Sequence, residues 1–201
     1  MRHTPYIRLW YRKAYRPPVQ SRPTLYLTFD DGPIPEVTPW VLETLKEWNA
    51  KATFFVIGEN VQKHPSLYHE VLLNGHEVGN HTFSHIMGKQ TDLATYLHEI
   101  QRCAALVKTP FFRPPYGSLT RAQYRKVVQQ SKLVMWDVMS YDFLENKSGE
   151  YCGNKVIRGA KNGDVVVFHD SVKAFPRLKI ALPMVLEHFS KLGFHFEALT
   201  L

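Results

Sequence analysis

Two adjacent carboxylates stand at the end of an apolar run near the start of the chain. The run is LYLTF at residues 25–29, and Asp30 and Asp31 follow it directly, before the turn residues Gly32 and Pro33. Its β-branched and aromatic content predicts a buried strand that stops at this turn. Two carboxylates at a buried strand end are costly unless a cation lies near them. We interpret the pair as one metal ligand and one free base, although Asp-Asp-Gly alone is also an ordinary turn sequence.

Two imidazoles four residues apart supply further metal-ligand chemistry. They are His81 and His85, in the sequence HTFSH. This spacing predicts that both lie on one face of a helical turn, where they can hold one cation. A chain with ten histidines contains such a pair easily by chance, so the pair alone is a weak signal. Combined with a carboxylate it becomes a familiar zinc set that leaves positions open for water and substrate.

Further candidate residues follow later apolar runs. In RPPYG at residues 113–117, two prolines stiffen a loop that can hold Arg113 near a carboxylate and present the Tyr116 backbone N–H to an oxyanion. The run VVVF leads into His169, whose ordinary pKa suits a general acid, and Asp142 is able to orient that imidazole. A proline-rich turn and a core histidine are the plain alternatives. The chain lacks a serine-hydrolase elbow and a glycine-rich phosphate loop.

Short apolar runs alternate with longer amphipathic segments along the chain. The runs predict strands at residues 25–29, 52–57, 76–79, 110–112, 133–137, 165–168 and 195–199. Helical periodicity predicts helices at 37–48, 66–73, 92–107, 120–130, 151–160 and 178–192. This alternation is typical of a parallel α/β sheet, either open or closed into a barrel. Each candidate motif follows a strand, and strand ends converge on one rim of a barrel, so we expect a single-domain barrel.

Length, charge and cysteines limit the remaining possibilities. A chain of 201 residues with a net charge of +7 is long enough for one domain with a substantial core. Much of the excess charge lies in a basic, aromatic N-terminal arm, residues 1–23. The arm is expected either to contact an anionic membrane or wall polymer or to be solvated and loosely packed. Nucleic-acid binding is not expected, because no recognition signature accompanies the charge. Cys103 and Cys152 are expected to be reduced thiols.

The hydropathy pattern bears on localisation. The N-terminus carries no continuous apolar stretch of the kind found in secretory signals, and no apolar stretch of membrane-spanning length occurs in the sequence. From this pattern we expect a cytoplasmic or membrane-peripheral protein.

Taken in order, these motifs resemble those of the polysaccharide deacetylases, the NodB-homology enzymes of carbohydrate esterase family 4. The matching segments are TFDDGP at 28–33, HTFSH at 81–85, RPPYG at 113–117, DF at 142–143 and FHD at 168–170. The resemblance covers residues 24–201 and leaves the arm outside. It implies a distorted, incomplete (β/α)7 barrel that removes N-acetyl groups from N-acetylated sugars or polysaccharides such as peptidoglycan, chitin-like polymers or poly-N-acetylglucosamine.

The resemblance also implies a role for the candidate residues. Asp30 corresponds to a general base oriented by Arg113, and His169 corresponds to a general acid tuned by Asp142. A divalent metal ion, zinc or else cobalt, nickel or manganese, is implied on three ligands: Asp31, His81 and His85.

The remaining implied roles concern the substrate. The resemblance places the Tyr116 backbone N–H in an oxyanion hole, and we expect Trp136, Phe143 and either Leu199 or the apolar groups near it to shape an acetyl-sized pocket. The fourth motif departs from the family pattern Asp-x-x-Asp-Trp, because Met139 stands in place of the first Asp and Phe143 in place of Trp. This departure affects the expected substrate preference. The alternatives are a hydrolase of another non-peptide C–N bond and a catalytically silent carbohydrate-binding module.

Overall fold

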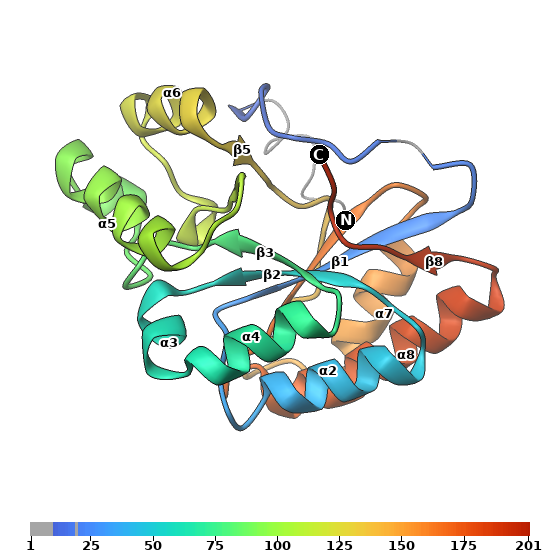
Figure 1. The fold of residues 1–201 in the computed structure, drawn as a ribbon. Coiled ribbons are helices and arrows are strands. Elements are labelled where there is room, and N and C mark those ends of the chain that lie inside the picture. The colour runs from blue at the N-terminus through green and yellow to red at the C-terminus, as the bar shows by residue number, and fades with distance from the viewer. Residues whose placement is uncertain (1–9, 19) are drawn as a thin grey trace.

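A computed structural model describes residues 10–18 and 20–201. Its strands form one parallel sheet in the order β5-β4-β3-β2-β1-β7-β6, with β8 beside β1 (Figure 1). The strands are β1 (Thr24–Asp30), β2 (Ala52–Val56), β3 (Glu77–Asn80), β4 (Phe111–Phe112), β5 (Lys132–Leu133), β6 (Val138–Met139), β7 (Val165–His169) and β8 (His195–Phe196). β1 lies centrally between β2 and β7, which agrees with its complete burial.

The two ends of the sheet are joined by a very short connection. β5 and β6 lie at opposite ends of the strand order, yet only residues 134–137 separate them in sequence. The Val134 N–H donates to the Phe112 carbonyl on one side, and the Asp137 N–H donates to the Val165 carbonyl on the other, each at 2.8 Å. The sheet must therefore curl into a half-barrel, which confirms the expected distorted, incomplete barrel. The predicted strand 133–137 is wrong, because the chain there crosses from one edge to the other.

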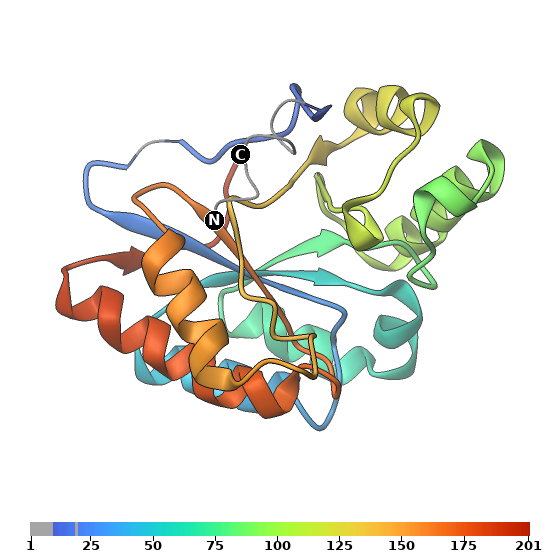
Figure 2. The same cartoon turned by 180° about the vertical axis from the view of Figure 1, so that it is seen from behind.

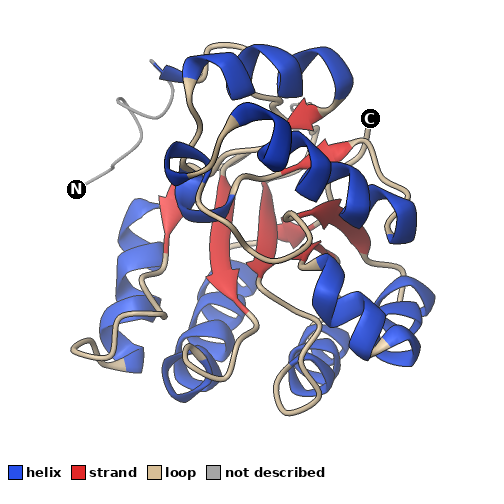
Figure 3. Cartoon of the chain, turned by 90° about the vertical axis from the view of Figure 1, so that its left-hand side faces the viewer, coloured by secondary structure: helices blue, strands red, loops and turns tan. Residues whose placement is uncertain are grey.

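Helices surround the strands in the view of Figure 3. They are α2 (Thr38–Glu47), α3 (Gly58–Lys63), α4 (Pro65–Leu73), α5 (Leu93–Leu106), α6 (Arg121–Gln130), α7 (Gly149–Gly159) and α8 (Phe175–Lys191), with 3-10 turns η1 (Gly88–Gln90) and η2 (Pro115–Gly117). The six predicted helices are confirmed within a few residues at their ends. The short helix α3 was missed, because its buried residues are only Gly58 and Val61, too few to form a helical stripe.

Side-chain alternation along β1 separates the core from the interior of the half-barrel. Leu25, Leu27 and Phe29 belong to the main core, which also includes buried residues of α2, α4, α7 and α8. Figure 2 shows α7 and α8 lying side by side on this outer face. Tyr26 belongs instead to a second cluster inside the half-barrel, with Phe55 and other buried side chains. Because strand side chains alternate between faces, Asp30 shares the inner face with Tyr26.

Part of the N-terminal arm packs against the domain. The Tyr11 hydroxyl donates to the Gly117 carbonyl at 2.9 Å, and the Tyr15 N–H donates to the Leu133 carbonyl at 2.7 Å. Tyr11 and Tyr15 therefore attach the arm to the domain, while Arg12, Lys13, Arg16 and Arg22 are exposed to solvent. Membrane contact through the arm stays a prediction, and Arg2 and Arg8, which contribute to it, lie outside the described residues. Within the described residues, no helix has both the length and the apolar character needed to cross a membrane.

Candidate active site

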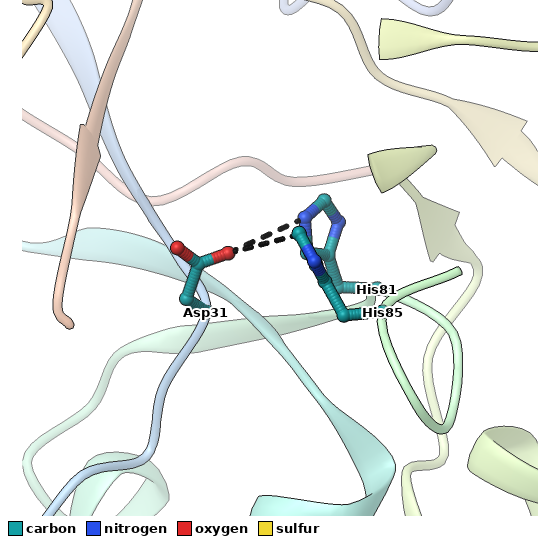
Figure 4. A group of neighbouring side chains, drawn as sticks. All are labelled: Asp31, His81 and His85. Atoms are coloured by element: carbon teal, nitrogen blue, oxygen red, sulfur yellow. Dashed lines mark ion pairs between the residues drawn. The ribbon is translucent and has the colours of Figure 1, made fainter. Parts of the chain in front are cut away.

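Asp31, His81 and His85 come together at the carboxyl ends of β1 and β3. Figure 4 shows the Asp31 carboxylate facing both imidazoles, with Oδ1 3.2 Å from His85 Nε2 and 3.8 Å from His81 Nε2. One ligand atom from each residue lies within 4.8 Å of the others. Asp31 Oδ1 is buried without a hydrogen-bond partner, which is the state expected of a carboxylate oxygen whose partner is a cation. The residues present therefore fit a divalent metal ion with one oxygen and two nitrogen ligands.

The two histidines lie on a loop, and the predicted helical turn is wrong. Residues 81–87 form no helix, and both Thr82 and His85 have positive φ angles, 64° and 56°. The loop is held from β2 and α5: the His81 N–H donates to the Val56 carbonyl at 3.0 Å, and Glu99 accepts from the Ser84 N–H at 2.8 Å. The two imidazoles, four residues apart, thus come together through a compact loop in which two residues have the left-handed backbone conformation.

The protonation states in this cluster suit metal binding. Burial lowers the pKa of His81 to about 4, and the nearby His85 acts in the same direction, so His81 is neutral near pH 7. His81 Nδ1 lies 2.8 Å from the Arg113 carbonyl, which requires the proton on Nδ1 and leaves Nε2 as the ligand atom. Burial acts to raise the pKa of Asp31, but His85, His169 and His81 outweigh it and hold that pKa below its usual range.

Asp30 is paired with a fully buried arginine. Arg113 follows β4 directly, and its Nη1 donates to Asp30 Oδ1 at 2.6 Å and to the Thr28 hydroxyl at 2.8 Å. The guanidinium lies over the Phe55 ring, 4.1 Å from its centroid. With Oδ1 engaged, Asp30 Oδ2 lies 4.0 Å from His81 Nε2, beside the metal-ligand set. The arrangement presents one carboxylate oxygen to the cavity and fixes the other.

His169, the last residue of β7, is paired with Asp142. His169 Nδ1 donates to Asp142 Oδ1 at 2.7 Å, and the fully buried Asp142 follows β6. Burial acts to lower the pKa of His169, but the Asp142 charge and hydrogen bond, with the charges of Asp31 and Asp30, raise it to about 9. His169 is therefore an imidazolium near neutral pH, the form able to donate a proton.

Most of the predicted site residues line one cavity of about 420 Å³. Eight of the ten contribute to its wall: Asp30, Asp31, His81, His85, Tyr116, Trp136, Phe143 and His169. Arg113 and Asp142 lie behind this wall, each fully buried. Leu199 is not part of the cavity: it packs inside the half-barrel with Tyr26 and Phe55, so its predicted place in the pocket is wrong. Tyr116 has a φ of 59°, and its ring lies 4.8 Å from that of His85.

Asp170 and Lys173 were not predicted to contribute to this site, and Met139 was noted only as a departure from the family's fourth motif. Asp170 is fully buried and accepts hydrogen bonds from the Gly32 N–H at 3.0 Å and the Thr38 hydroxyl at 2.7 Å. It anchors the turn that carries Asp31, and burial raises the pKa of Asp170 to about 8. Its position next to His169 was the available sequence signal. Unlike Asp170, Met139 and Lys173 line the cavity itself, and nothing in the sequence pattern set Lys173 apart.

A parallel half-barrel with an Asp-His-His cluster, a buried Asp-Arg pair and an Asp-His pair at one rim defines a hydrolase-type site. The family model described as polysaccharide deacetylase matches residues 18–136, and the chain belongs to this family. It is 36% identical over 178 residues to a peptidoglycan-N-acetylglucosamine deacetylase of Bacillus cereus, covering 85% of this chain and 83% of that one.

Two further comparisons agree with the family assignment. A chitooligosaccharide deacetylase of Azorhizobium caulinodans is 36% identical over 160 residues, covering 75% of each chain. Among solved structures, the peptidoglycan N-acetylglucosamine deacetylase Bc1960 superposes with a TM-score of 0.86 at 30% identity, covering 97% of this chain and 94% of that one. The family and the fold are therefore those that the motifs indicated, while the chemical roles of the individual residues stay predictions.

Proposed function

We propose that the protein is a metal-dependent hydrolase that removes N-acetyl groups from an N-acetylated polysaccharide. The observation that carries the proposal is the placement of three metal-ligating atoms within 4.8 Å of one another, in a cavity that Asp30 and His169 also line. The relatives support the substrate class, because one is a peptidoglycan-N-acetylglucosamine deacetylase and another is a chitooligosaccharide deacetylase.

The metal-ligand set lines the same cavity as Asp30 and His169. A divalent metal ion held by Asp31, His81 and His85 would supply Lewis-acid polarisation of the amide carbonyl and a lowered pKa for water. Zinc fits one carboxylate and two imidazoles, as cobalt, nickel or manganese also do with different preferences.

The chain's own residues then perform the proton transfers. Asp30 accepts a proton from the attacking water through Oδ2, because Arg113 donates to Oδ1 and Oδ2 is the oxygen left to face the cavity. The water oxygen bonds to the carbonyl carbon, and the Tyr116 backbone N–H stabilises the oxyanion. As the C–N bond breaks, His169 gives its proton to the departing sugar amine, and acetate leaves.

The test combines metal binding with product analysis. Chelator-stripped protein is titrated with zinc by calorimetry, and acetate release is then measured on N-acetylated oligosaccharides. We expect one tight site per chain, lost in Asp31→Ala and kept in Asp30→Asn, and a loss of about 10²–10⁴ in kcat for Asp30→Asn. Wild-type turnover in Asp30→Asn would refute its assignment as the base.

The product identifies the reaction. Acetate supports N-deacetylation, whereas formate or ammonia would indicate hydrolysis of another C–N bond at the same residues. Sugar binding without any product would indicate a catalytically silent module. The fold is known with and without activity, because a structural relative at 25% identity and a TM-score of 0.74 is described as a mutant of a CE4 family pseudoenzyme with restored enzymatic activity.

A further inference from the structure

The N-terminal arm contacts the loop that carries Tyr116, although the segment matched by the family model begins only at residue 18. The Tyr11 hydroxyl donates to the Gly117 carbonyl at 2.9 Å and accepts from the Leu119 N–H at 3.2 Å. One side chain of the arm therefore holds both ends of the segment 117–119, directly after Tyr116. Burial raises the pKa of Tyr11 above its ordinary value, so the hydroxyl keeps the proton that it donates.

The backbone at Tyr116 has a conformation that its surroundings must stabilise. Tyr116 and Gly117 have successive positive φ angles, 59° and 61°. A tyrosine is disfavoured in this region and adopts it only where neighbouring contacts determine the backbone. Within the loop, the Gly117 N–H turns back to the Pro114 carbonyl at 3.0 Å. Tyr11 adds contacts from another part of the chain, and these fix the peptide unit that follows Gly117.

A second contact of the arm lies beside the segment that leads to Trp136. The Tyr15 N–H donates to the Leu133 carbonyl at 2.7 Å, and the Tyr15 ring lies 5.3 Å from that of Phe111; Figures 1 and 2 show the arm passing β5 here. Gly117 lies against the Trp136 ring: a Cβ at position 117 would come within 2.6 Å of it. Gly117 and Trp136 both line the cavity of the candidate active site. The arm is therefore attached to two segments that meet at the cavity wall.

We propose that Tyr11 is a positioning residue for the reaction, and that it orients the Tyr116 N–H toward the oxyanion by fixing the peptide unit after Gly117. This inference rests on the proposed function, since it concerns the group that stabilises the oxyanion there. It gives the arm a part in the reaction, through a residue that precedes the segment matched by the family model. Because the oxyanion develops only in the transition state, the contribution of Tyr11 belongs to kcat and not to KM.

The test removes a single hydroxyl group from the arm. Tyr11→Phe keeps a ring beside that of Tyr124, 5.4 Å away, and loses both hydrogen bonds to the loop. Acetate release from an N-acetylglucosamine oligosaccharide by zinc-loaded protein gives kcat and KM. We expect kcat to fall by about tenfold, less than the ~10²–10³-fold loss typical when an oxyanion donor is removed outright. KM, and the zinc dissociation constant measured by calorimetry, are expected to stay at their wild-type values.

Tyr15→Phe is the matched control, because it makes the same substitution in the same arm. The Tyr15 hydroxyl donates to the Thr200 carbonyl and not to the loop, while the N–H and the ring that attach the arm at Leu133 and Phe111 are kept in the variant. We expect its kcat to stay near the wild-type value. The free energy of unfolding in urea is measured for both variants, so that a general loosening of the arm is detected as a loss of stability common to both.

The outcomes separate this inference from the proposed function. A loss of kcat confined to Tyr11→Phe, with KM and zinc affinity unchanged, supports the positioning role. Equal kcat in the two variants, a rise in KM in place of a fall in kcat, or weakened zinc binding in Tyr11→Phe overturns that role and leaves the deacetylase assignment intact. No acetate from the wild-type protein, with a full complement of zinc, overturns the proposed function and this inference with it.

Discussion

Asp142 holds His169 at two atoms. Its Oδ1 accepts from the imidazole Nδ1–H at 2.7 Å, and its Oδ2 accepts from the backbone N–H of the same residue at 2.8 Å. The carboxylate therefore fixes the ring's position as well as its protonation state. Because Nδ1 is engaged, Nε2 is the ring atom left to exchange a proton with substrate.

Replacing Asp142 with asparagine is expected to narrow the pH range of activity. The carboxylate helps raise the pKa of His169 to about 9, so without its charge the imidazolium deprotonates at lower pH. A general acid works only while protonated, and the basic limb of the kcat profile should therefore move to lower pH. The measurement is kcat for acetate release between about pH 6 and 10. A basic limb that stays in place in Asp142→Asn would contradict the role of Asp142.

Arg113→Met is expected to destabilise the fold strongly. The substitution leaves the Asp30 carboxylate buried without its partner, which typically costs about 3–5 kcal/mol. The measurement is the free energy of unfolding in urea. Arg102→Met is the matched control: Arg102 also pairs with a carboxylate at 2.7 Å, but it is 43% exposed, so the expected cost is roughly 1 kcal/mol. Equal losses in the two variants would argue against a buried, compensating role for Arg113.

Asp170→Ala is expected to weaken metal binding without removing a ligand. The Asp170 carboxylate holds the Gly32 N–H and the Thr38 hydroxyl, and the turn between β1 and α2 carries Asp31. Loss of such a supporting contact typically costs about 10–100-fold in metal affinity. Zinc calorimetry measures the change. Asp170→Asn keeps an acceptor for Gly32 and should stay near wild type; an unchanged affinity in Asp170→Ala would show that the turn holds without it.

His76 is expected to make the fold less stable in acid. Its ring is buried, it accepts a hydrogen bond from the Ala52 N–H at 3.2 Å, and burial lowers its pKa to about 4. The contribution of neutral His76 to the free energy of unfolding is complete above the pKa of the unfolded chain, near 6.5. It is lost as the pH falls from there to about 4.

The loss expected from His76 is on the order of 3 kcal/mol. Urea unfolding at pH 7 and pH 4.5 measures it, and His76→Leu should abolish this part of the pH dependence. The exposed His69 provides the control for replacing a histidine, since His69→Gln should leave the free energy of unfolding at pH 7 near the wild-type value. An unaltered pH dependence in His76→Leu would contradict the assignment.

The fold could be predicted largely because its elements carry local signals. β1 is completely buried and reads as a continuous apolar run, and the capping box between Thr120 and Gln123 marks the start of α6. The misplaced elements lack such signals. Residues 134–137 are apolar enough to resemble a strand, but their hydrogen bonds go to Phe112 in β4 and Val165 in β7, which lie near opposite ends of the strand order. Which edge they join depends on the curvature of the whole sheet.

By itself, the sequence determined the residue types of the site and the strand ends that carry them, because parallel strands place their carboxyl ends on one rim. Only the tertiary structure decided how those residues meet. It placed His81 and His85 on a loop in which Thr82 and His85 have positive φ angles. It packed Leu199 inside the half-barrel, away from the pocket, and it brought Asp170 into hydrogen-bond contact with the turn that carries Asp31. These contacts join residues that are distant in the chain, so they follow from packing and hydrogen-bond geometry, which no local pattern records.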